Sequence, residues 1–267
     1  MLGGVTVSRN RMMNPFKFRR LAVSAVQELT PQLTRVTLTG DMSEFVSRGP
    51  ADHVKVFFPG PDGVLNAPYI GEDGKLVRDP DVEYISRDYT PLNWTETTLD
   101  LDFVIHGDEG PASRWAANAK EGDELVIGGP RGSKELPVGA DWWLLIADAS
   151  AVPALGRWLA EAPAEQKVSA LVFGEESLSQ YPLPPDADVE WVLGDFDPEP
   201  YVRERDVSTG TGFIWAAGES TSLIGVRRYL RRELGLPKEQ VDVDGYWRKG
   251  VADADHHAPI DPDDPED

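Results

Sequence analysis

The 267-residue chain is 40% hydrophobic, and its 46 Asp and Glu against 26 Lys and Arg leave a formal net charge of −20. This charge argues against a nucleic-acid partner, because phosphate binding depends on clustered Lys and Arg. The lack of cysteine excludes disulfides, thiolate metal sites and thiol nucleophiles, so redox chemistry requires an organic cofactor or a metal held by oxygen or nitrogen.

The first half of the chain is expected to form short strands. Residues 34–39, 53–58 and 99–105 alternate apolar and polar side chains, which is the period of a half-buried strand. Several such strands with few helices between them predict a small antiparallel barrel. A helix is expected to begin near Pro111, because proline is tolerated in a first helical turn and small residues follow it.

After residue 138 the pattern changes to alternating strands and helices. The apolar run at 142–147 is typical of a strand buried on both faces, and residues 152–162 follow with helical spacing. This alternation predicts a parallel sheet with right-handed crossovers, an α/β arrangement of the nucleotide-binding type. The other expected elements are strands at 168–173, 189–193, 213–217 and 241–243 and a helix at 220–234.

These patterns predict a barrel domain at 16–137, an α/β domain at 138–250 and an acidic tail at 251–267. The tail is rich in Asp and carries no Lys or Arg, so we expect it to be disordered. No run approaches the roughly 20 apolar residues of a membrane span. The basic start of the chain is not followed by an apolar signal segment, so we expect a cytoplasmic protein without a membrane partner.

Five short segments, in this order, resemble those of siderophore-interacting proteins of the ferredoxin-reductase-like superfamily. They are Arg87-Asp88-Tyr89-Thr90, His106-Gly107-Asp108-Glu109-Gly110-Pro111, Gly129-Pro130-Arg131-Gly132-Ser133, Ala217-Gly218-Glu219 and Gly245-Tyr246-Trp247-Arg248. The resemblance covers about residues 16–250. It implies an antiparallel FAD-binding barrel, a parallel-sheet NAD(P)H-binding-like domain and FAD-dependent reduction of ferric siderophores.

The resemblance implies roles for the first of these segments. Tyr89 would lie against the flavin, Thr90 would hydrogen-bond near its N5 edge, and Arg87 would face the pyrophosphate. A planar guanidinium that is always charged suits phosphate oxygens. Taken alone, the segment would favour an Arg and a Tyr on an ordinary strand, and its occurrence with the other motifs reverses that interpretation.

The expected helix start would hold the FAD pyrophosphate with Gly110, Pro111, Ala112 and Ser113. Its backbone N–H groups and the positive end of the helix dipole attract anions, and glycine permits close approach. The alternative is a helix start without a ligand.

Three more residues are candidates for cofactor binding on the same resemblance. His106 ends a predicted strand, Ser133 ends the Gly129-to-Ser133 turn, and Trp247 would line the flavin. A structural histidine and a simple interdomain turn are the alternatives for the first two.

The dinucleotide candidates are Asp148, Ser150, Gly218 and Glu219, at two expected strand-to-helix junctions. The family commonly has Gly-Asp-Glu-Thr-Ala where this chain reads Ala147-Asp148-Ala149-Ser150-Ala151. A Cβ in place of that glycine could crowd a dinucleotide. The turn therefore departs from the family pattern at the residue that would approach the dinucleotide.

Lys55, Arg248 and Lys249 are the candidates for a basic rim that receives an anionic iron chelate, because opposite charge steers a ligand and adds affinity. The alternative is that they are surface cations paired with Asp52, Asp242 and Asp244. The arginines at 227, 228, 231 and 232 could meet a 2′-phosphate or an electron-carrier protein, but a charge run on an amphipathic helix favours a solvated face.

The expected partners are a ferric siderophore and either NAD(P)H or ferredoxin as electron donor, with the chain acting as a monomer. Because FAD carries the electrons, no side-chain acid, base or nucleophile is required. Two alternatives remain: a flavin-dependent reductase with another acceptor, such as a quinone or free flavin, and a non-catalytic siderophore-binding protein. The sequence identifies neither the siderophore nor the donor.

Overall fold

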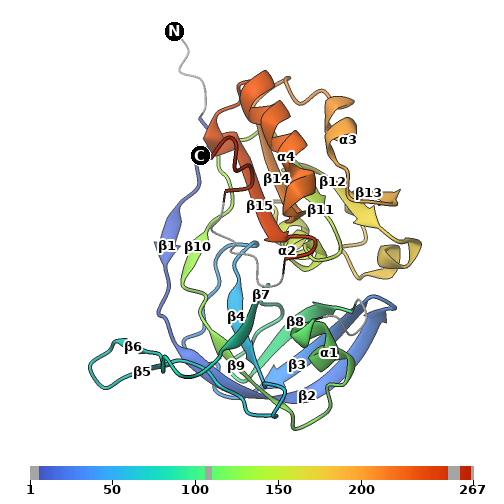
Figure 1. Cartoon of the computed structure of the whole chain (residues 1–267). Coiled ribbons are helices and arrows are strands. Elements are labelled where there is room, and N and C mark those ends of the chain that lie inside the picture. Colours follow the sequence, from blue (N-terminus) through green and yellow to red (C-terminus); the bar gives the residue numbers. More distant parts are fainter. Residues whose placement is uncertain (1–5, 106–109, 252–258, 266–267) are drawn as a thin grey trace. The chain divides into compact units, whose positions relative to one another are not determined.

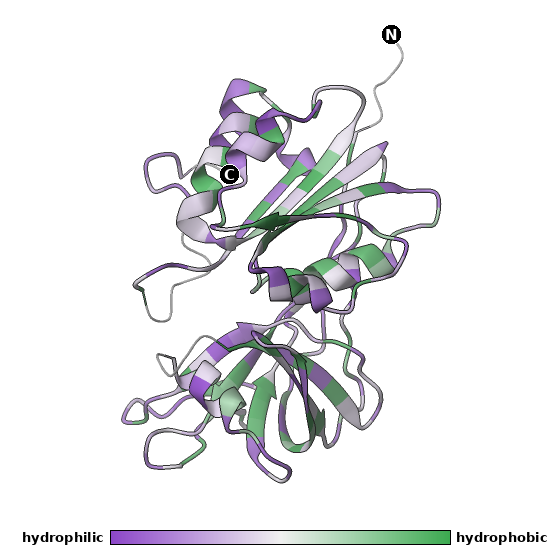
Figure 2. Cartoon of the chain, turned by 90° about the vertical axis from the view of Figure 1, so that its right-hand side faces the viewer, coloured by the Kyte–Doolittle hydropathy of each residue, from purple (hydrophilic) through white to green (hydrophobic). Residues whose placement is uncertain are grey.

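The computed structural model describes residues 6–105, 110–251 and 259–265. It consists of two compact units, one formed by Arg11–Lys134 and the other by Met1–Asn10 with Glu135–Asp267 (Figure 1). Each unit has its own sheet, with apolar side chains along its strands (Figure 2). Among the described residues, no helix combines the length and apolar character that crossing a membrane requires.

The first unit is built on a curled antiparallel sheet. Its elements are β1 (Arg11–Met13), β2 (Phe18–Thr30), β3 (Leu33–Thr39), β4 (Val54–Phe58), β5 (Tyr69–Ile70), β6 (Leu76–Val77), β7 (Ile85–Tyr89), β8 (Thr98–Val104), α1 (Pro111–Ala117), β9 (Glu124–Gly128) and β10 (Gly132–Lys134). Six strands pair in the order β7-β4-β9-β2-β3-β8, so β7 and β8 are its edges. Helix α1 contacts both edge strands. The result is the half-open form of the expected barrel.

The alternation expected in β8 places one set of side chains in the core. Leu99, Leu101 and Phe103 are fully buried. Asp102, on the other face, is also buried, and both its oxygens accept hydrogen bonds from Arg35 on β3 at 2.7 and 2.8 Å. A carboxylate expected to face solvent is thus held by a cross-strand guanidinium, which satisfies its charge.

The 13-residue strand β2 is not among the elements that the sequence pattern predicts. Its pairing with β3 shifts register between Val23 and Ala25 and again between Glu28 and Thr30. Each shift interrupts the alternation of inward and outward side chains, so the period-2 signal is lost although the strand is continuous.

The second unit contains the expected parallel sheet. Its elements are β11 (Trp142–Ala147), α2 (Val152–Glu161), β12 (Lys167–Gly174), the 3₁₀ turn η1 (Glu176–Gln180), β13 (Asp188–Leu193), α3 (Glu199–Arg203), β14 (Gly212–Glu219), α4 (Ser220–Arg228), the π-helical turn η2 (Tyr229–Glu233), the 3₁₀ turn η3 (Lys238–Gln240) and β15 (Val241–Trp247). All five strands are parallel, in the order β13-β12-β11-β14-β15. The strand order therefore reverses between β11 and β14.

Helices cover both faces of this sheet. Trp158 of α2 packs against Trp143 and Trp215, with ring centroids 5.6 and 5.8 Å apart. Leu223 and Val226 of α4 belong to the cluster on the opposite face, with Leu144 of β11. Apolar side chains on both faces explain why these strands read as continuous hydrophobic runs.

Residues 6–10 belong to the α/β unit because Arg9 is anchored there. Its guanidinium lies 5.0 Å from the ring centroid of Trp158 and pairs with Asp242. Its Nε also donates to the carbonyl oxygen of Glu135 at 2.7 Å. A cation on an aromatic face with a carboxylate partner is a favourable arrangement.

Part of the acidic tail differs from the expected disorder. Asp261 is 1% exposed and accepts hydrogen bonds from Arg228, and Asp264 pairs with Arg232 and with Arg227, the latter at 3.2 Å. Arg227 is 3% exposed, so the expectation of a solvated arginine face is wrong for this residue. Composition predicted disorder because it does not reveal that helix α4 and turn η2 supply arginine partners for these carboxylates.

Candidate functional site

Strand β7 positions Arg87 and Tyr89, and Thr90 follows it. Because side chains alternate along a strand, Arg87 and Tyr89 share one face of β7 and Asp88 lies on the other. The ring of Tyr89 packs on Phe103, with centroids 4.4 Å apart, and burial raises the pKa of its hydroxyl. Tyr89 is therefore a neutral, fixed aromatic surface at the edge of the sheet.

Helix α1 is tied to the same aromatic cluster. Trp115 packs on Phe103 and Phe58, with centroids 5.6 and 5.7 Å apart, and Phe58 in turn lies 6.2 Å from Tyr89. Helix α1 also contacts β7. The structure thus brings together the two segments proposed for FAD, through Phe58, Phe103 and Trp115, which sequence reasoning did not select because they read as core residues.

The N-cap of α1 is Gly110, followed by Pro111 at the first helical position. Gly110 has no side chain that could cap the first turn, and its carbonyl oxygen accepts a hydrogen bond from the Arg114 N–H at 2.9 Å. Ala112 and Ser113 are 6% and 4% exposed. His106, the other candidate beside this helix, lies outside the described residues.

Ser133 has a different environment from the one expected. Its hydroxyl donates to Asp52 Oδ2 at 2.5 Å and accepts from Asn14 Nδ2 at 2.8 Å and from the Arg48 N–H at 3.1 Å. One donor and two acceptor sites are all that a hydroxyl has. Ser133 therefore fastens β10 to two loops and has no remaining capacity for a cofactor.

In the α/β unit, Asp148 lies at the carboxyl end of β11, where the strand order reverses. Its carboxylate accepts hydrogen bonds from the Ser150 N–H and Oγ, the Glu219 N–H and Trp247 Nε1, at 2.8, 2.5, 3.0 and 2.7 Å. Burial raises the pKa of Asp148, and these hydrogen bonds oppose the shift. The structure therefore brings together four residues that the sequence assigned to two different ligands.

Position 218 requires a glycine because its backbone lies close to the Asp148 side chain. Its φ is +151°, and a Cβ on it would lie 2.7 Å from Asp148 Cγ and 2.6 Å from the ring of Phe196. The group that lies close to this glycine is therefore the Asp148 side chain. A dinucleotide at this edge would have to bind beside Gly218, because the Asp148 carboxylate fills the space against it.

Glu219 is the N-cap of α4. Its carboxylate accepts from the Ser222 N–H at 2.8 Å and the Lys249 N–H at 3.1 Å. Burial acts to raise the pKa of Glu219, but the hydrogen bonds outweigh it and the pKa is below its usual value. The carboxylate holds the start of α4 and the residues after β15 together.

Two family models match the chain in succession. A siderophore-interacting FAD-binding domain matches residues 22–134, and a siderophore-interacting protein domain matches residues 140–250. The "NADPH-dependent ferric-chelate reductase" of Escherichia coli (strain K12) is 34% identical over 245 residues, covering 89% of this chain and 95% of that protein. The chain belongs to the siderophore-interacting protein family.

Two further proteins are similar to most of the chain. The "Ferric vibriobactin reductase ViuB" of Vibrio cholerae serotype O1 is 30% identical, covering 86% of this chain and 89% of that protein. The crystal structure of a siderophore utilization protein from T. fusca has a TM-score of 0.85 at 36% identity, covering 94% of this chain and all of that one. The family and the ferredoxin-reductase-like fold expected from the motifs are thereby confirmed.

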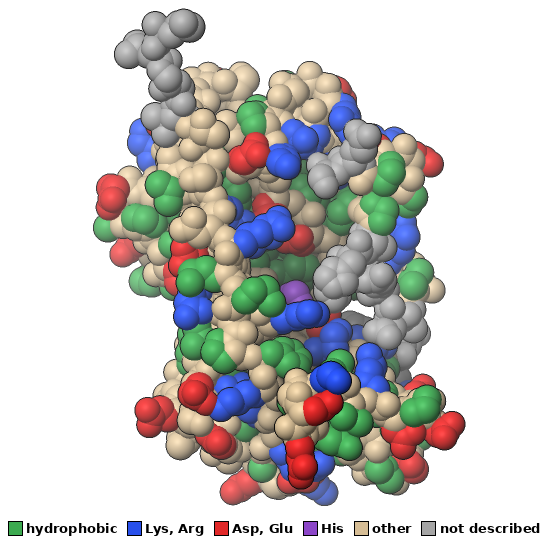
Figure 3. Space-filling model, turned by 90° about the vertical axis from the view of Figure 1, so that its left-hand side faces the viewer, with side chains coloured by type: hydrophobic (Ala, Val, Ile, Leu, Met, Phe, Trp, Pro, Cys, Tyr) green, Lys and Arg blue, Asp and Glu red, His purple; other side chains and the backbone are tan. Residues whose placement is uncertain are grey.

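Lys55 pairs with Asp88 on the neighbouring strand, with Nζ 2.9 Å from Oδ1, and not with Asp52. Its side chain remains 42% exposed. Lys and Arg side chains are among those exposed on the face of the molecule shown in Figure 3. Arg248 and Lys249 belong to the α/β unit, directly after β15. The basic rim expected of this siderophore-interacting protein therefore draws on both units and stays a prediction.

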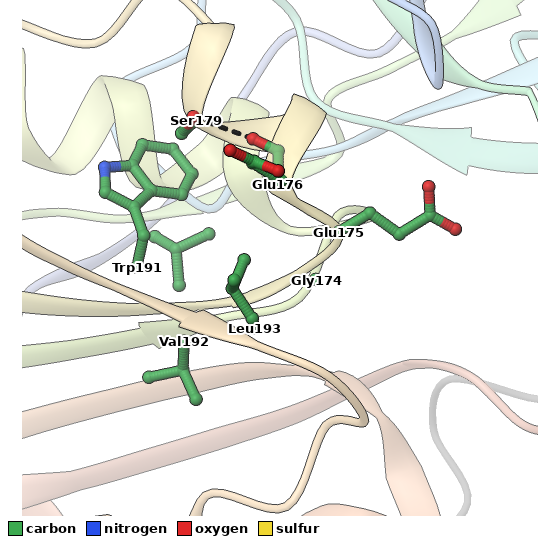
Figure 4. Close-up of a pocket in the computed structure, with 8 residues that line it drawn as sticks. Gly174, Glu175, Glu176, Ser179, Trp191, Val192 and Leu193 are labelled. Carbon is green, nitrogen blue, oxygen red and sulfur yellow. Dashed lines mark hydrogen bonds between the residues drawn. The ribbon is translucent and has the colours of Figure 1, made fainter.

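A pocket that sequence reasoning missed lies at the carboxyl ends of β12 and β13 (Figure 4). Its volume is about 210 Å³. It is lined by Val172, Gly174, Glu175, Glu176, Ser179, Trp191, Val192 and Leu193. The available signal was a Gly-Glu-Glu sequence directly after the second apolar run of the α/β half.

Proposed function

We propose that this chain is an FAD-dependent oxidoreductase that reduces iron(III) held by a siderophore, with electrons supplied by NAD(P)H. One observation carries the proposal: both segments assigned to FAD converge on the aromatic cluster of Phe58, Tyr89, Phe103 and Trp115, inside the unit matched by the FAD-binding family model. The names of the E. coli and V. cholerae relatives support the same activity.

The barrel residues fit FAD by their chemistry. Tyr89 offers a fixed ring to a planar heterocycle, Thr90 a hydroxyl, and Arg87, on the same face as Tyr89, a guanidinium for phosphate oxygens. The backbone N–H groups of Gly110, Ala112 and Ser113 at the start of α1 would donate to phosphate oxygens. We also retain His106 and Trp247 as candidate contacts, and we exclude Ser133 because its hydroxyl is fully used.

Bound FAD would supply the redox chemistry, since it accepts two electrons together and releases them singly. The protein's part is to hold the ring, exclude water and receive the substrate. Siderophores hold iron(III) through hard oxygen ligands, and the softer iron(II) is bound more weakly. Reduction would therefore release iron and leave the chelator intact.

For the substrate we propose the rim of Lys55, Arg248 and Lys249, whose charge would steer an anionic chelate. The ion pair with Asp88 holds the Lys55 ammonium in place while leaving the side chain 42% exposed. Mutating rim charges should lower the association rate more than the rate of electron transfer, and should do so most at low salt.

For the electron donor we propose NAD(P)H, with ferredoxin as the alternative, and we propose that the protein acts as a cytoplasmic monomer. The dinucleotide would contact the edge formed by Asp148, Ser150, Gly218 and Glu219. A second candidate function, siderophore binding without catalysis, is favoured by one observation: Asp148 fills the space against Gly218 that a dinucleotide would otherwise approach.

The deciding experiment is anaerobic. FAD-loaded protein is mixed with NADH, NADPH or reduced ferredoxin and a ferric siderophore, while flavin absorbance and capture of iron(II) by a chromogenic chelator are followed. Bleaching followed by iron(II) capture supports the reductase. Binding of the siderophore without bleaching by any donor supports the non-catalytic alternative, and faster turnover of a quinone or free flavin supports a different acceptor.

The proposed FAD contact at Arg87 has a matched control. Arg87→Met removes the guanidinium on the Tyr89 face of β7, whereas Arg78→Met removes an exposed guanidinium that lies over Tyr84 in the same unit. We expect weaker FAD binding only for Arg87→Met. Equal FAD affinities of the two variants would remove Arg87 from the site.

A further inference from the structure

Two glutamates and a tryptophan are among the residues that line the pocket at the ends of β12 and β13. Gly174 ends β12 and pairs with Leu193, which ends β13, so the pocket opens at the carboxyl edge of the sheet. Glu175 and Glu176 follow β12 directly, and η1, which begins at Glu176, is closed by a hydrogen bond from Ser179 Oγ to the Glu176 carbonyl at 2.7 Å (Figure 4).

The sheet topology indicates that this pocket lies where ligands bind. In open parallel sheets, ligands bind outside the carboxyl ends of the strands, at the point where the strand order reverses. Here that point lies between β11 and β14, and β12 is the next neighbour of β11. A dinucleotide that starts at the reversal point and runs along this edge would cross the end of β12 and reach the pocket.

The chemistry of the lining discriminates between the two pyridine dinucleotides. A carboxylate at the end of the second strand accepts hydrogen bonds from the ribose 2′-hydroxyl of NADH, whereas NADPH carries a phosphate there and requires a cation. Among the residues that the structure describes, the lining includes Glu175 and Glu176 and no Lys or Arg.

The apolar part of the lining suits a purine. Trp191 is partly buried on β13 and turns its indole to the pocket, beside Val172 and the 66% exposed Leu193 (Figure 4). A base with two π faces packs well between an aromatic ring and aliphatic side chains. The pocket therefore offers separate places to the two halves of an adenosine.

We infer that this pocket holds the adenosine end of the electron donor, with adenine against Trp191 and the ribose hydroxyls on Glu175 and Glu176, and that the chain consequently prefers NADH to NADPH. The inference rests on the proposed function in taking a pyridine dinucleotide as donor. The preference is opposite to the one in the name of the E. coli relative.

The test is the binding of NAD⁺ and NADP⁺, which are not consumed, to the full FAD-loaded chain by titration calorimetry. We expect NAD⁺ to bind tighter by roughly tenfold or more, the scale of bringing like charges together at a protein surface. Glu175→Arg combined with Glu176→Gln should reverse the ratio. Glu165→Gln, an exposed carboxylate before β12 at the opposite edge, should leave it unchanged.

Trp191→Leu tests the adenine contact separately from the ribose contacts. It should weaken the binding of both nucleotides by similar factors and leave the ratio of their affinities unchanged. Equal or tighter binding of NADP⁺ by the natural sequence, an unchanged ratio in the double variant, or no binding of either nucleotide would each overturn the inference. Protein reduced with dithionite gives the independent readout of the proposed function. If it reduces a ferric siderophore while NAD⁺ does not bind, only the donor inference falls.

Discussion

Trp247 Nε1 donates a 2.7 Å hydrogen bond to Asp148 Oδ2, which joins the end of β15 to the turn after β11. The sequence resemblance assigned one residue to the flavin and the other to a dinucleotide, yet each is a partner of the other. Trp247 remains 44% exposed, so the hydrogen bond fixes the side chain without burying the residue. A ring fixed in this way is preorganised for stacking on a ligand.

Asp148→Asn should destabilise the α/β unit. Four donors converge on the Asp148 carboxylate, and an amide would turn its own N–H₂ toward at least one of them. We expect a loss of about 1–3 kcal/mol in the free energy of unfolding, the cost of an unsatisfied buried group. Chemical denaturation followed by tryptophan fluorescence measures it. Asp186→Asn, in an exposed loop of the same unit, is the control, and equal stabilities would contradict the network.

The contact between the tail and α4 should weaken in acid. Arg232 and Arg227 hold the pKa of Asp264 at about 2, and Arg228 lowers the pKa of Asp261. Because both values are depressed on folding, the stabilisation is complete above the unfolded value of about 3.9 and is lost as pH falls toward about 2. Melting temperatures between neutral pH and pH 3 should therefore converge for the natural chain and an Asp261→Asn, Asp264→Asn variant.

Asp263→Asn is the matched control for this pH effect, since the Asp263 side chain is 91% exposed and lies 3.8 Å from Arg228. Its melting temperature should follow that of the natural chain at every pH. If the double variant melts with the natural chain at neutral pH, the ion pairs of the tail do not contribute to stability.

Ser133→Ala should affect stability and not cofactor affinity. The change removes a donor to the buried Asp52 carboxylate and an acceptor for Asn14, so we expect a loss of about 1–3 kcal/mol in unfolding free energy. FAD affinity, measured by quenching of flavin fluorescence, should stay the same. Ser24→Ala, which removes an exposed hydroxyl of β2, is the control. Weaker FAD binding at unchanged stability would restore Ser133 to the cofactor site.

Tyr89→Leu should weaken FAD binding by about 1–3 kcal/mol, the typical contribution of an aromatic ring stacked on a heterocycle. Tyr89→Phe keeps the ring and its packing on Phe103, so most of the affinity should remain. Tyr69→Leu, at a 60% exposed tyrosine in β5, provides the comparison. Equal FAD affinity of all three variants would show that the ring of Tyr89 does not contact the flavin.

The amino-acid pattern was sufficient to predict the parallel sheet and most of the barrel. A continuous apolar run such as Trp142–Ala147 is favourable in a strand that is buried on both faces. The alternation at residues 99–105 is favourable in a strand that is buried on one face. The five ordered motifs were likewise sufficient for the family. Strand β2 was not predicted, because its register shifts break the alternation of apolar and polar side chains on which such a prediction depends.

The hydrogen-bond partners of the polar side chains could not be predicted from the sequence pattern. Ser133 and Asp52 are far apart in the chain, as are Asp148 and Trp247 or Asp261 and Arg228, and a side chain's periodicity says nothing about which distant segment meets it. Folding brings strand ends and loops together, and there a buried carboxylate or hydroxyl takes whichever donors are near, because leaving it unsatisfied is costly. Local pattern follows from burial, whereas the use of each polar group follows from long-range contacts.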